Sequence, residues 1–570
     1  MFILNKLKMY LYKFKIYLLF FLSINMFTCK NKTIAFNKAN SVVSSIHPIA
    51  SEIGINILNE NGNAIDAAIG TGLALGVLDQ FNSGLGGGAF IMIRLSNGEI
   101  FSIDGREKAP GKATRNMYNI DGKTNLYYSQ NGPLSVAVPG LPAAYVKALN
   151  LAGTKTLEEL IKPSINIAKK GFKLDDDYIR RYKINIEELK KDSSSRKIYF
   201  NRQGKEFKKG DIFIQKDLSS TYQKFGKNGI DYFYKGEFAN KLVKLMKERE
   251  GLITHDDMRN YKAIQREPIQ GKYKNYNVYG MGPPSSGGIN VLQMLNMIEI
   301  SGILNGKKEL DKESIYYISL IMSEVFQSRS NDLGDPDFNN INIKNLISKS
   351  YAQKKLLDIE SKEKKIKNNS NQNFNSGHTT NLCVIDKWGN VVVINQTVNH
   401  TFGSKVTVPG TGVILNNEMD DFSIESGLPN AFGLTGGEIN SIEGNKRPLS
   451  SMSPTIITKN DKPIIIVGGA GGPRIITSVL QSIINILDFN LSVENAISKP
   501  RFHQQFIPDA IYVEKGFSNE IINYLEEKDY EIIEKEKLGI VNIIAWDSTK
   551  NIYTGASDVR VRQGKASRGN

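Results

Sequence analysis

One stretch of the chain limits its possible folds more than any other, because a polar segment runs directly into two apolar strands. Residues 361–378 are rich in Asn and Lys and show no periodicity, which predicts a mobile surface linker. Residues 379–386 and 391–398 flank the turn Lys387-Trp388-Gly389-Asn390, which predicts a β-hairpin of core strands. Linkers more often end in turn residues, whereas this one ends directly before Thr379. The pattern alone favours a linker between two domains.

The composition is that of a globular protein with a basic surface. Of the 570 residues, 40% are hydrophobic and 9% aromatic, which excludes a disordered or fibrous chain. The chain has 73 Lys and Arg against 58 Asp and Glu, a net charge of +15, but no dense basic stripe. We therefore expect a solvated basic surface and no nucleic-acid partner. Two cysteines exclude a disulfide framework and a thiolate zinc site, and Cys383 is expected to be a buried strand residue.

The first 29 residues have the organisation of an export signal. Lysines between Lys6 and Lys15 precede an apolar run over residues 16–24, which is shorter than a typical transmembrane span. We predict that residues 1–29 are a signal peptide and that the protein is exported to the periplasm or the extracellular space. Residues 26–29 also resemble a degenerate lipoprotein box. Two alternatives stay open: a lipid on Cys29 that anchors the protein to a membrane, or cleavage nearby with Cys29 incidental.

Apolar periodicity divides the chain into an α-rich first half and a β-rich second half. Between residues 49 and 78 apolar residues recur at helical spacing, and Gly62-Asn63 predicts a break between two helices. Residues 84–88 are rich in glycine and precede a predicted strand at residues 89–94. A dinucleotide-binding fingerprint needs the strand before the glycines and a helix after them, so the reversed order excludes that fold.

The motifs of common hydrolase nucleophiles are absent from the sequence. It contains no Gly-x-Ser-x-Gly elbow, no Walker loop and no His-Glu-x-x-His motif, and its five histidines lack metal-ligand spacing. We therefore expect neither a metal nor a cofactor. A hydrolase built on this chain would need a nucleophile that carries its own base, as a threonine at a new N-terminus does. Its α-amino group, with an ordinary pKa of about 7.7–8.0, can accept the hydroxyl proton, which requires a cut just before Thr379.

Several separated motifs, taken in chain order, make a family resemblance specific. They are Gly62–Ala68, Asp104–Pro110, Asp332–Phe338, Gly377–Thr380, Asn416–Phe422, Arg447–Pro454, Gly468–Arg474 and Pro500–His503. Together they resemble the γ-glutamyltranspeptidase family over roughly residues 40–560. The resemblance implies an α+β fold, the four-layer αββα sandwich of N-terminal-nucleophile hydrolases. It also implies one precursor that is cut into a large chain, residues 30–378, and a small catalytic chain, residues 379–570, which stay together as a heterodimer.

The resemblance assigns the catalytic roles to four residues. Thr379 would be the nucleophile twice, first on the carbonyl of His378 at the cleavage site between these residues, and then on the γ-amide of the substrate. Thr397 would orient the hydroxyl or amine of the nucleophile. Gly471 and Gly472 would donate backbone N–H groups to the oxyanion, and glycine suits this role because no Cβ obstructs close approach.

A glutamyl head group carries a carboxylate and an ammonium group, so its pocket needs both signs of charge. The resemblance assigns the carboxylate to Arg106, Ser450 and Ser451, a guanidinium fork with two hydroxyl donors. It assigns the ammonium group to Asn399, Glu418 and Asp421.

Two positions depart from the pattern of many relatives. Phe432 lies in a predicted lid loop, residues 428–437, where some bacterial members have Tyr. A lid hydrogen bond would therefore be missing, while the apolar shielding survives. Pro473 follows the two glycines where several relatives have Ser, and it leaves their N–H groups in place.

Three functions compete for this sequence. The first is a γ-glutamyl hydrolase and transferase that acts on glutathione and similar γ-glutamyl amides, with amino acids or dipeptides as acceptors. The second is a related enzyme with another acyl substrate, such as a β-lactam side-chain acylase or a capsule poly-γ-glutamate depolymerase. The third is an uncut surface lipoprotein that only retains the fold. Arg106 with Ser450 and Ser451 suits a free α-carboxylate on the substrate and favours the first function.

Overall fold

The computed structural model describes residues 40–201, 203–361, 378–425, 427–560 and 565–568. The predicted signal peptide, Cys29 and residues 362–377 of the predicted linker lie outside these ranges. In the part of the chain that is described, none of the helices is both long and apolar enough to cross a membrane.

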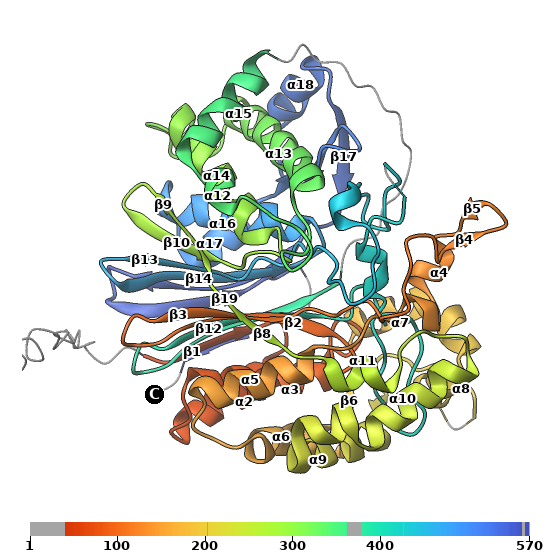
Figure 1. Cartoon of the computed structure of the whole chain (residues 1–570). Helices are drawn as coiled ribbons and strands as arrows, with labels where there is room; N and C mark the ends of the chain where they lie inside the picture. Colours follow the sequence, from red (N-terminus) through yellow and green to blue (C-terminus); the bar gives the residue numbers. More distant parts are fainter. Residues whose placement is uncertain (1–39, 202, 362–377, 426, 561–564, 569–570) are drawn as a thin grey trace, which may run out of the picture.

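Two stacked antiparallel sheets form the centre of the molecule (Figure 1). The first sheet has seven strands in the order β20 (Lys565–Arg568), β1 (Val42–Ser45), β11 (Thr380–Ile385), β12 (Val391–Thr397), β2 (Gly88–Arg94), β3 (Ile100–Gly105) and β8 (Ile264–Arg266). The second has six strands in the order β19 (Ile552–Ser557), β18 (Ile540–Asp547), β14 (Lys462–Ala470), β13 (Thr455–Lys459), β10 (Tyr276–Gly280) and β9 (Ile269–Tyr273). In the first sheet, β1 lies between β20 and β11, and β12 lies beside β2, so strands from before and after Thr379 are interleaved; in the second sheet they meet at β13 and β10.

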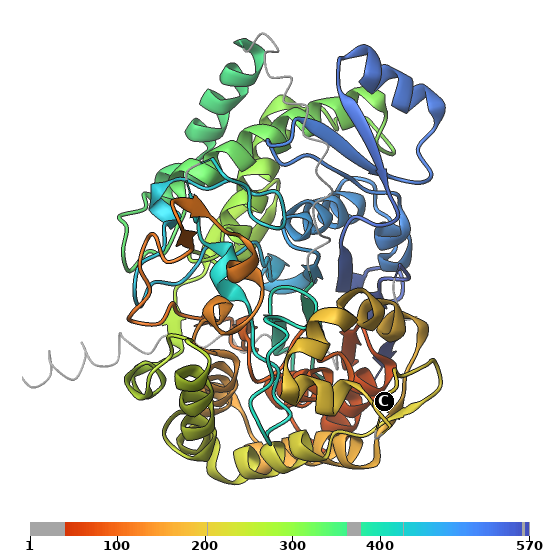
Figure 2. The same ribbon diagram turned by 90° about the vertical axis from the view of Figure 1, so that its right-hand side faces the viewer.

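Helices cover the outer face of each sheet. Below the first sheet lie α2 (Pro48–Asn59), α3 (Ala64–Leu78), α5 (Leu141–Ala152), α6 (Leu157–Lys170), α7 (Asp176–Lys191), α8 (Ser193–Tyr199), α9 (Lys216–Ile230), α10 (Glu237–Glu248) and α11 (His255–Asn260). Above the second lie α12 (Gly287–Ser301), α13 (Lys312–Asp332), α14 (Ile343–Leu346), α15 (Lys349–Ser361), α16 (Arg474–Leu487), α17 (Val493–Ser498) and α18 (Asn519–Glu527). Figure 2 shows the two helical layers again at opposite ends of the molecule. This arrangement is the predicted four-layer αββα sandwich.

The predicted break between the first two helices is confirmed. The helix α2 ends at Asn59, and Asn63 begins α3 with a capping box: its side-chain oxygen accepts from the N–H groups of Ile65 and Asp66. The Asp66 carboxylate in turn accepts from the N–H of Asn63 at 2.9 Å. Such reciprocal capping satisfies backbone donors that have no partner inside a helix.

The predicted hairpin is also confirmed, and its two faces lie in different cores. In β11 and β12, Leu382 pairs with Ile394 and both face the helices below, whereas Cys383 pairs with Val393 and both face the second sheet. Both faces are apolar because the hairpin is covered on both sides. Cys383 is fully buried, and burial raises the pKa of its thiol, as expected for a structural residue.

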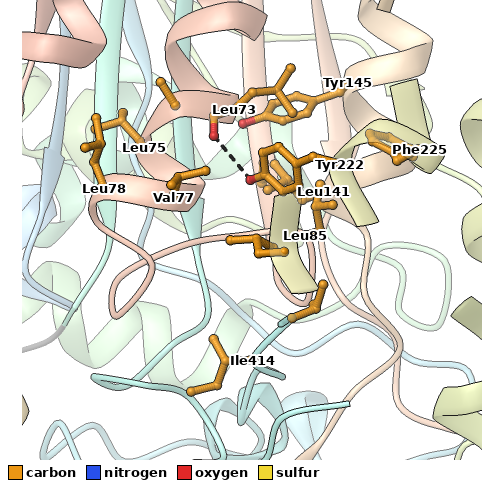
Figure 3. Close-up of a cluster of buried hydrophobic side chains, with 14 of the residues drawn as sticks. Leu73, Leu75, Val77, Leu78, Leu85, Leu141, Tyr145, Tyr222, Phe225 and Ile414 are labelled. Carbon is orange, nitrogen blue, oxygen red and sulfur yellow. Dashed lines mark hydrogen bonds between the residues drawn. The ribbon is translucent and has the colours of Figure 1, made fainter. Parts of the chain in front are cut away.

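The core below the first sheet extends to the end of β12. It packs α3, α5 and α9 together, and the Tyr222 hydroxyl donates to the carbonyl of Leu73 at 3.2 Å (Figure 3). Close by, the Tyr145 hydroxyl donates to the side chain of Gln396, whose amide donates to Ser83 Oγ at 2.9 Å. Gln396 is thus fixed by buried hydrogen bonds at the position next to Thr397.

Candidate active site

The start of β11 and the end of β12 place two threonines side by side. Thr380 pairs with Gln396 in the hairpin, so Thr379 lies beside Thr397, with 3.3 Å between the two Oγ1 atoms. Both side chains are buried; Thr379 is 6% exposed and Thr397 2%. The hairpin register therefore brings together the two threonines singled out in the sequence.

A chain of hydrogen bonds joins the hydroxyl of Thr379 to the peptide bond that precedes it. The Thr379 hydroxyl donates to Thr397 Oγ1, and the Thr397 hydroxyl donates to the carbonyl oxygen of His378 at 2.9 Å. The N–H of Asn399 donates to the same Thr397 oxygen at 2.8 Å. Thr397 thus receives a hydrogen bond from the candidate nucleophile while it polarises the carbonyl that this nucleophile would attack.

The side chain of His378 lies in a basic environment. Its Nδ1 accepts a hydrogen bond of 2.5 Å from Arg181, and Lys537 lines the same small cavity. Burial, together with the charges of Arg181, His400 and Lys537, holds the pKa of His378 well below its ordinary value. The imidazole is therefore neutral, as its acceptance of the Arg181 hydrogen bond requires.

Gly471 and Gly472 lie where β14 ends and α16 begins. Their φ angles are +135° and +61°, in the region that favours glycine. A Cβ on Gly471 would also lie 2.9 Å from the Cα of Gly539. Pro473 occupies the N-cap position of α16, so both glycines lie next to the positive end of a helix dipole. This position is favourable for a developing negative charge.

Arg106 forms the centre of a buried charged cluster. Its guanidinium contacts Glu418 and, at 2.5 Å, Asp421, while its Nε donates to the carbonyl of Pro448 at 3.0 Å. Burial opposes the charge of Arg106, but the carboxylates of Glu418 and Asp421 outweigh burial and raise its pKa. Burial raises the pKa of Glu418 well above its ordinary value, although Arg106 acts against that shift.

Hydrogen bonds hold the side chains of the two serines and of Asn399 around this cluster. Ser450 Oγ accepts from the N–H of Met452 at 3.2 Å. Asn399 adopts a positive φ of +73°, and its side-chain amide donates to the carbonyl of Asn417 at 3.1 Å. Ser451 Oγ accepts from Arg329, a residue that the sequence analysis did not select.

Phe432 covers the cavity from the predicted lid loop. Its ring lies edge-on to His400, with 4.9 Å between the ring centroids, and it is buried. The Gln505 amide donates to the carbonyl of Phe432 at 3.1 Å, and Asp420 accepts from the N–H of Ala431 at 3.2 Å. The loop is thus attached through its backbone on both sides of the aromatic ring.

Ten of the twelve predicted site residues line one cavity of about 20 Å³. They are Arg106, Thr379, Thr397, Asn399, Glu418, Asp421, Phe432, Ser450, Ser451 and Gly472. The other two, His378 and Gly471, line the adjoining cavity that contains Arg181. The sequence analysis missed Arg329, Leu434, Met452 and Ile475, which line the first cavity, and Glu107, which lies beside Arg106. Glu107 and Met452 stand within quoted motifs, and Arg329 only three residues before one, so proximity to a motif was the available signal.

Comparison with known proteins gives one consistent family. The family model described as "Gamma-glutamyltranspeptidase" matches residues 50–568. The chain is 39% identical over 532 residues to the glutathione hydrolase proenzyme of Escherichia coli K12, covering 91% of this chain and 90% of that protein. It is 34% identical over 541 residues to the glutathione hydrolase proenzyme of Bacillus subtilis 168, covering 91% and 90%.

Solved structures agree with this assignment. The crystal structure of Helicobacter pylori γ-glutamyltranspeptidase matches with a TM-score of 0.53 and 37% identity, over 57% of this chain and 93% of that chain. A cephalosporin acylase from Bacillus halodurans matches with a TM-score of 0.79 over 93% of this chain and 96% of that chain; at 24% identity it shows the shared fold alone. With the family model, the relatives and the fold in agreement, the chain belongs to the γ-glutamyltranspeptidase family.

Proposed function

We propose that this protein is a self-cleaving γ-glutamyl hydrolase and transferase that acts on glutathione and other γ-glutamyl amides. The observation that carries the proposal is the hydrogen-bond chain from the Thr379 hydroxyl through Thr397 to the carbonyl of His378. These contacts support roles for Thr379 as nucleophile and for Thr397 as proton acceptor at the peptide bond between His378 and Thr379, in a protein of this family.

The first reaction is cleavage of the chain. The Thr379 oxygen attacks the carbonyl carbon of His378, its proton passes toward Thr397, and the peptide C–N bond breaks as its nitrogen takes up a proton. The product is an ester between His378 and the Thr379 side chain. Water then hydrolyses this ester, which leaves a carboxylate on His378 and a free α-amine on Thr379.

The second reaction is turnover. The new α-amine accepts the hydroxyl proton while the Thr379 oxygen attacks the γ-carbonyl of the substrate, and the leaving amine departs with a proton. A γ-glutamyl ester of Thr379 remains, and it is transferred to water or to the amine of an amino acid or dipeptide. The N–H groups of Gly471 and Gly472, beside the start of α16, would bind the oxyanion of both steps; one such donor contributes about 10²–10³ in rate.

The charged cluster supports recognition of an amino-acid head group. In this structure Arg106 is held by the carboxylates of Glu418 and Asp421. A bound zwitterion would offer a carboxylate to Arg106, Ser450 and Ser451. Its ammonium group would compensate the carboxylates that then lose contact with Arg106, and Asn399 would supply an acceptor oxygen.

Two further parts of the proposal concern the mature protein. The chains that result from cleavage, residues 30–378 and 379–570, would remain associated, because both contribute strands to both sheets. We also propose that the protein is exported, with residues 1–29 removed as a signal peptide or processed to a lipid-bearing Cys29.

Mass spectrometry of the denatured protein tests the central step. The protein without residues 1–29 should yield a fragment that starts at Thr379, whereas the Thr379→Ala variant should remain whole. Cleaved protein should then release glutamate from glutathione. A wild-type chain that stays whole after long incubation would contradict self-cleavage, and a cleaved chain inactive on γ-glutamyl amides would point to another acyl substrate.

A further inference from the structure

A buried arginine that no motif included lines the candidate donor cavity. Arg329 lies in the last turn of α13, and 4% of it is exposed. It reaches the cavity from the helical layer above the second sheet, whereas Arg106 reaches it from the end of β3 in the first sheet. The cavity that holds Thr379 therefore has a guanidinium group on each of two sides.

The contacts of Arg329 tie it to the serine pair. Its Nε donates to Ser286 Oγ at 3.0 Å, and its Nη2 donates to Ser451 Oγ at 3.3 Å. The hydroxyl of Ser286 donates in turn to the carbonyl of Ser450 at 2.8 Å. One arginine thus supports both serines assigned to the carboxylate of the substrate.

The charge of Arg329 is not balanced by an ion pair. Two other buried arginines contact carboxylates: Arg501 lies 2.7 Å from Asp558, and Arg106 contacts Glu418 and Asp421. Among the residues that the structure describes, no ion pair joins Arg329 to a carboxylate, and both of its hydrogen-bond partners are neutral hydroxyls. Burial lowers the pKa of Arg329 to about 10, with the nearby carboxylate of Asp421 opposing the shift and the charge of Arg106 adding to it, so Arg329 remains protonated at neutral pH. A buried cation that contacts no carboxylate is costly, and an anion bound against it would lower that cost.

The hydrogen-bond directions also favour an anion at this position. A guanidinium group only donates hydrogen bonds, so Ser451 Oγ must accept from Arg329. Ser450 Oγ likewise accepts from the N–H of Met452. Each serine therefore keeps its own hydroxyl hydrogen available for a further acceptor. Two hydroxyl donors beside a guanidinium group that contacts no carboxylate fit a bound carboxylate.

We propose that Arg329 is a second binding residue for the α-carboxylate of the γ-glutamyl donor, acting together with the Ser451 hydroxyl that it orients. The inference rests on the proposed function and names a further residue of the same site. Arg106 contacts two carboxylates in the cavity, whereas the contacts of Arg329 among the described residues are hydroxyl groups. Selectivity of the pocket for the α-carboxylate should therefore depend on Arg329 as well as on Arg106.

Competitive inhibition measures this role without depending on fast turnover. L-Glutamate and 4-aminobutyrate are matched probes, because the second is the first without its α-carboxylate. In Arg329→Gln, we expect the inhibition constant of glutamate to rise by about 10- to 100-fold, as for loss of a charged hydrogen-bond donor. The inhibition constant of 4-aminobutyrate should change by less than about threefold, because 4-aminobutyrate lacks the carboxylate that Arg329 would bind.

Two further variants separate charge from packing. Arg329→Lys keeps the charge but loses the fork, so glutamate should bind with intermediate affinity. Ser286→Ala removes one anchor of Arg329 and leaves its charge, so it should raise the constant for glutamate less than Arg329→Gln does. Cleavage at His378–Thr379, read by mass spectrometry, reports whether each variant folds. If Arg329→Gln does not fold, the same two probes applied to Arg329→Lys decide the question.

Equal losses of affinity for glutamate and 4-aminobutyrate would overturn the proposal, because they would show a structural role alone. Unchanged affinity for both would overturn it as well. Wild-type turnover of glutathione distinguishes these results from failure of the proposed function. A wild-type enzyme that is cleaved but inactive on glutathione contradicts the function itself, whereas an active enzyme with an unaffected Arg329→Gln contradicts only the role of Arg329.

Discussion

The two sides of the candidate site are built in different ways. The side that carries the chemistry consists of neutral groups, the hydroxyls of Thr379 and Thr397 and the N–H of Asn399, all within or next to one hairpin. The side that would recognise the head group includes charged groups from distant segments, with Arg106 after β3, Glu418 in the 3-10 helix η3 (Glu418–Asp421) and Arg329 on α13.

This difference follows from what each side has to control. Attack on a carbonyl needs atoms fixed within a few tenths of an ångström, and the register of a buried hairpin provides that precision without charge. Recognition of a zwitterion needs both signs of charge in a dry cavity, and such charges are costly unless they compensate one another. We therefore expect substitutions on the neutral side to affect cleavage and turnover, and substitutions on the charged side to affect turnover alone.

The largest effect is expected at the nucleophile. Thr379→Ala removes the attacking oxygen, so cleavage should be absent and activity should fall by more than about 10³-fold. Thr379→Ser keeps the oxygen and the future amine and should still be cleaved, although more slowly. Mass spectrometry and glutamate release measure both properties. A Thr379→Ala chain that is still cleaved would contradict the role of Thr379 as the nucleophile, and with it the comparison of the two sides.

The next effect tests the relay within the neutral side. Thr397→Val keeps the shape of the side chain but removes the oxygen that joins Thr379 to the carbonyl of His378. We expect cleavage to slow by about 10²–10³-fold, the range for general acid–base or oxyanion contacts. Thr397→Ser should restore most of the rate. A time course of chain cleavage measures it, and a normal rate in Thr397→Val would show that Thr397 only packs.

The third prediction separates the two sides. Arg106→Gln should be cleaved at the wild-type rate, because among the described residues the side chain of Arg106 donates hydrogen bonds to Pro448, Glu418 and Asp421 and to neither threonine. Its kcat/KM for a γ-glutamyl amide should fall by about 10²-fold, since a buried charged partner is lost. Steady-state kinetics on cleaved protein measure this fall. Equal damage to cleavage and turnover would contradict the separation.

The smallest expected effect is on the pH dependence of stability, through Glu107 on the charged side of the site. Both carboxylate oxygens of Glu107 are buried and have no hydrogen-bond partner among the described residues. Burial raises the pKa of Glu107 from 4.5 to about 7, while Arg106 opposes the shift. The folded protein therefore holds a proton that the unfolded chain releases, so this group lowers the free energy of unfolding as pH rises from about 4.5 to 7.

Glu107→Gln should remove that pH dependence. We expect the variant to lose less thermal stability than the wild type between pH 5 and pH 8, by a few degrees in Tm. Thermal unfolding of both proteins at the two pH values measures the difference. Parallel curves would show that Glu107 titrates at its ordinary pKa.

Patterns within short segments predicted the local structure well. The break at Gly62-Asn63, the hairpin that begins after Thr379 and the burial of Cys383 each depend on neighbouring residues, and each is confirmed. The four-layer fold and the residues that line the cavity came from the resemblance to a family. Their gathering in one cavity depends on strand order, because β12 pairs with β2, about 300 residues earlier, and no local pattern encodes that pairing.

The sequence did not predict which charged side chains contact one another in the site. Glu418 and Asp421 were assigned to an ammonium group, but nothing in their motif indicates that they contact Arg106 when the chain is uncut. Arg329 lies in a helix whose other buried residues are mostly apolar, so its burial without a carboxylate partner emerges only in three dimensions. Both facts concern side chains that are far apart in the sequence, so the spacing of residues along the chain does not predict whether they meet.

Because strands from before and after Thr379 are interleaved in the first sheet, the proposed cut changes the kinetic order of folding. The uncut chain assembles β1, β11, β12 and β2 within one molecule, so its folding rate should not depend on protein concentration. Once the bond before Thr379 is broken, β11 and β12 belong to one chain and their neighbours β1 and β2 to the other. Recovery from denaturant should then be bimolecular, slower on dilution and open to exchange of partners, so that the protein folds as a unimolecular process only before it becomes active.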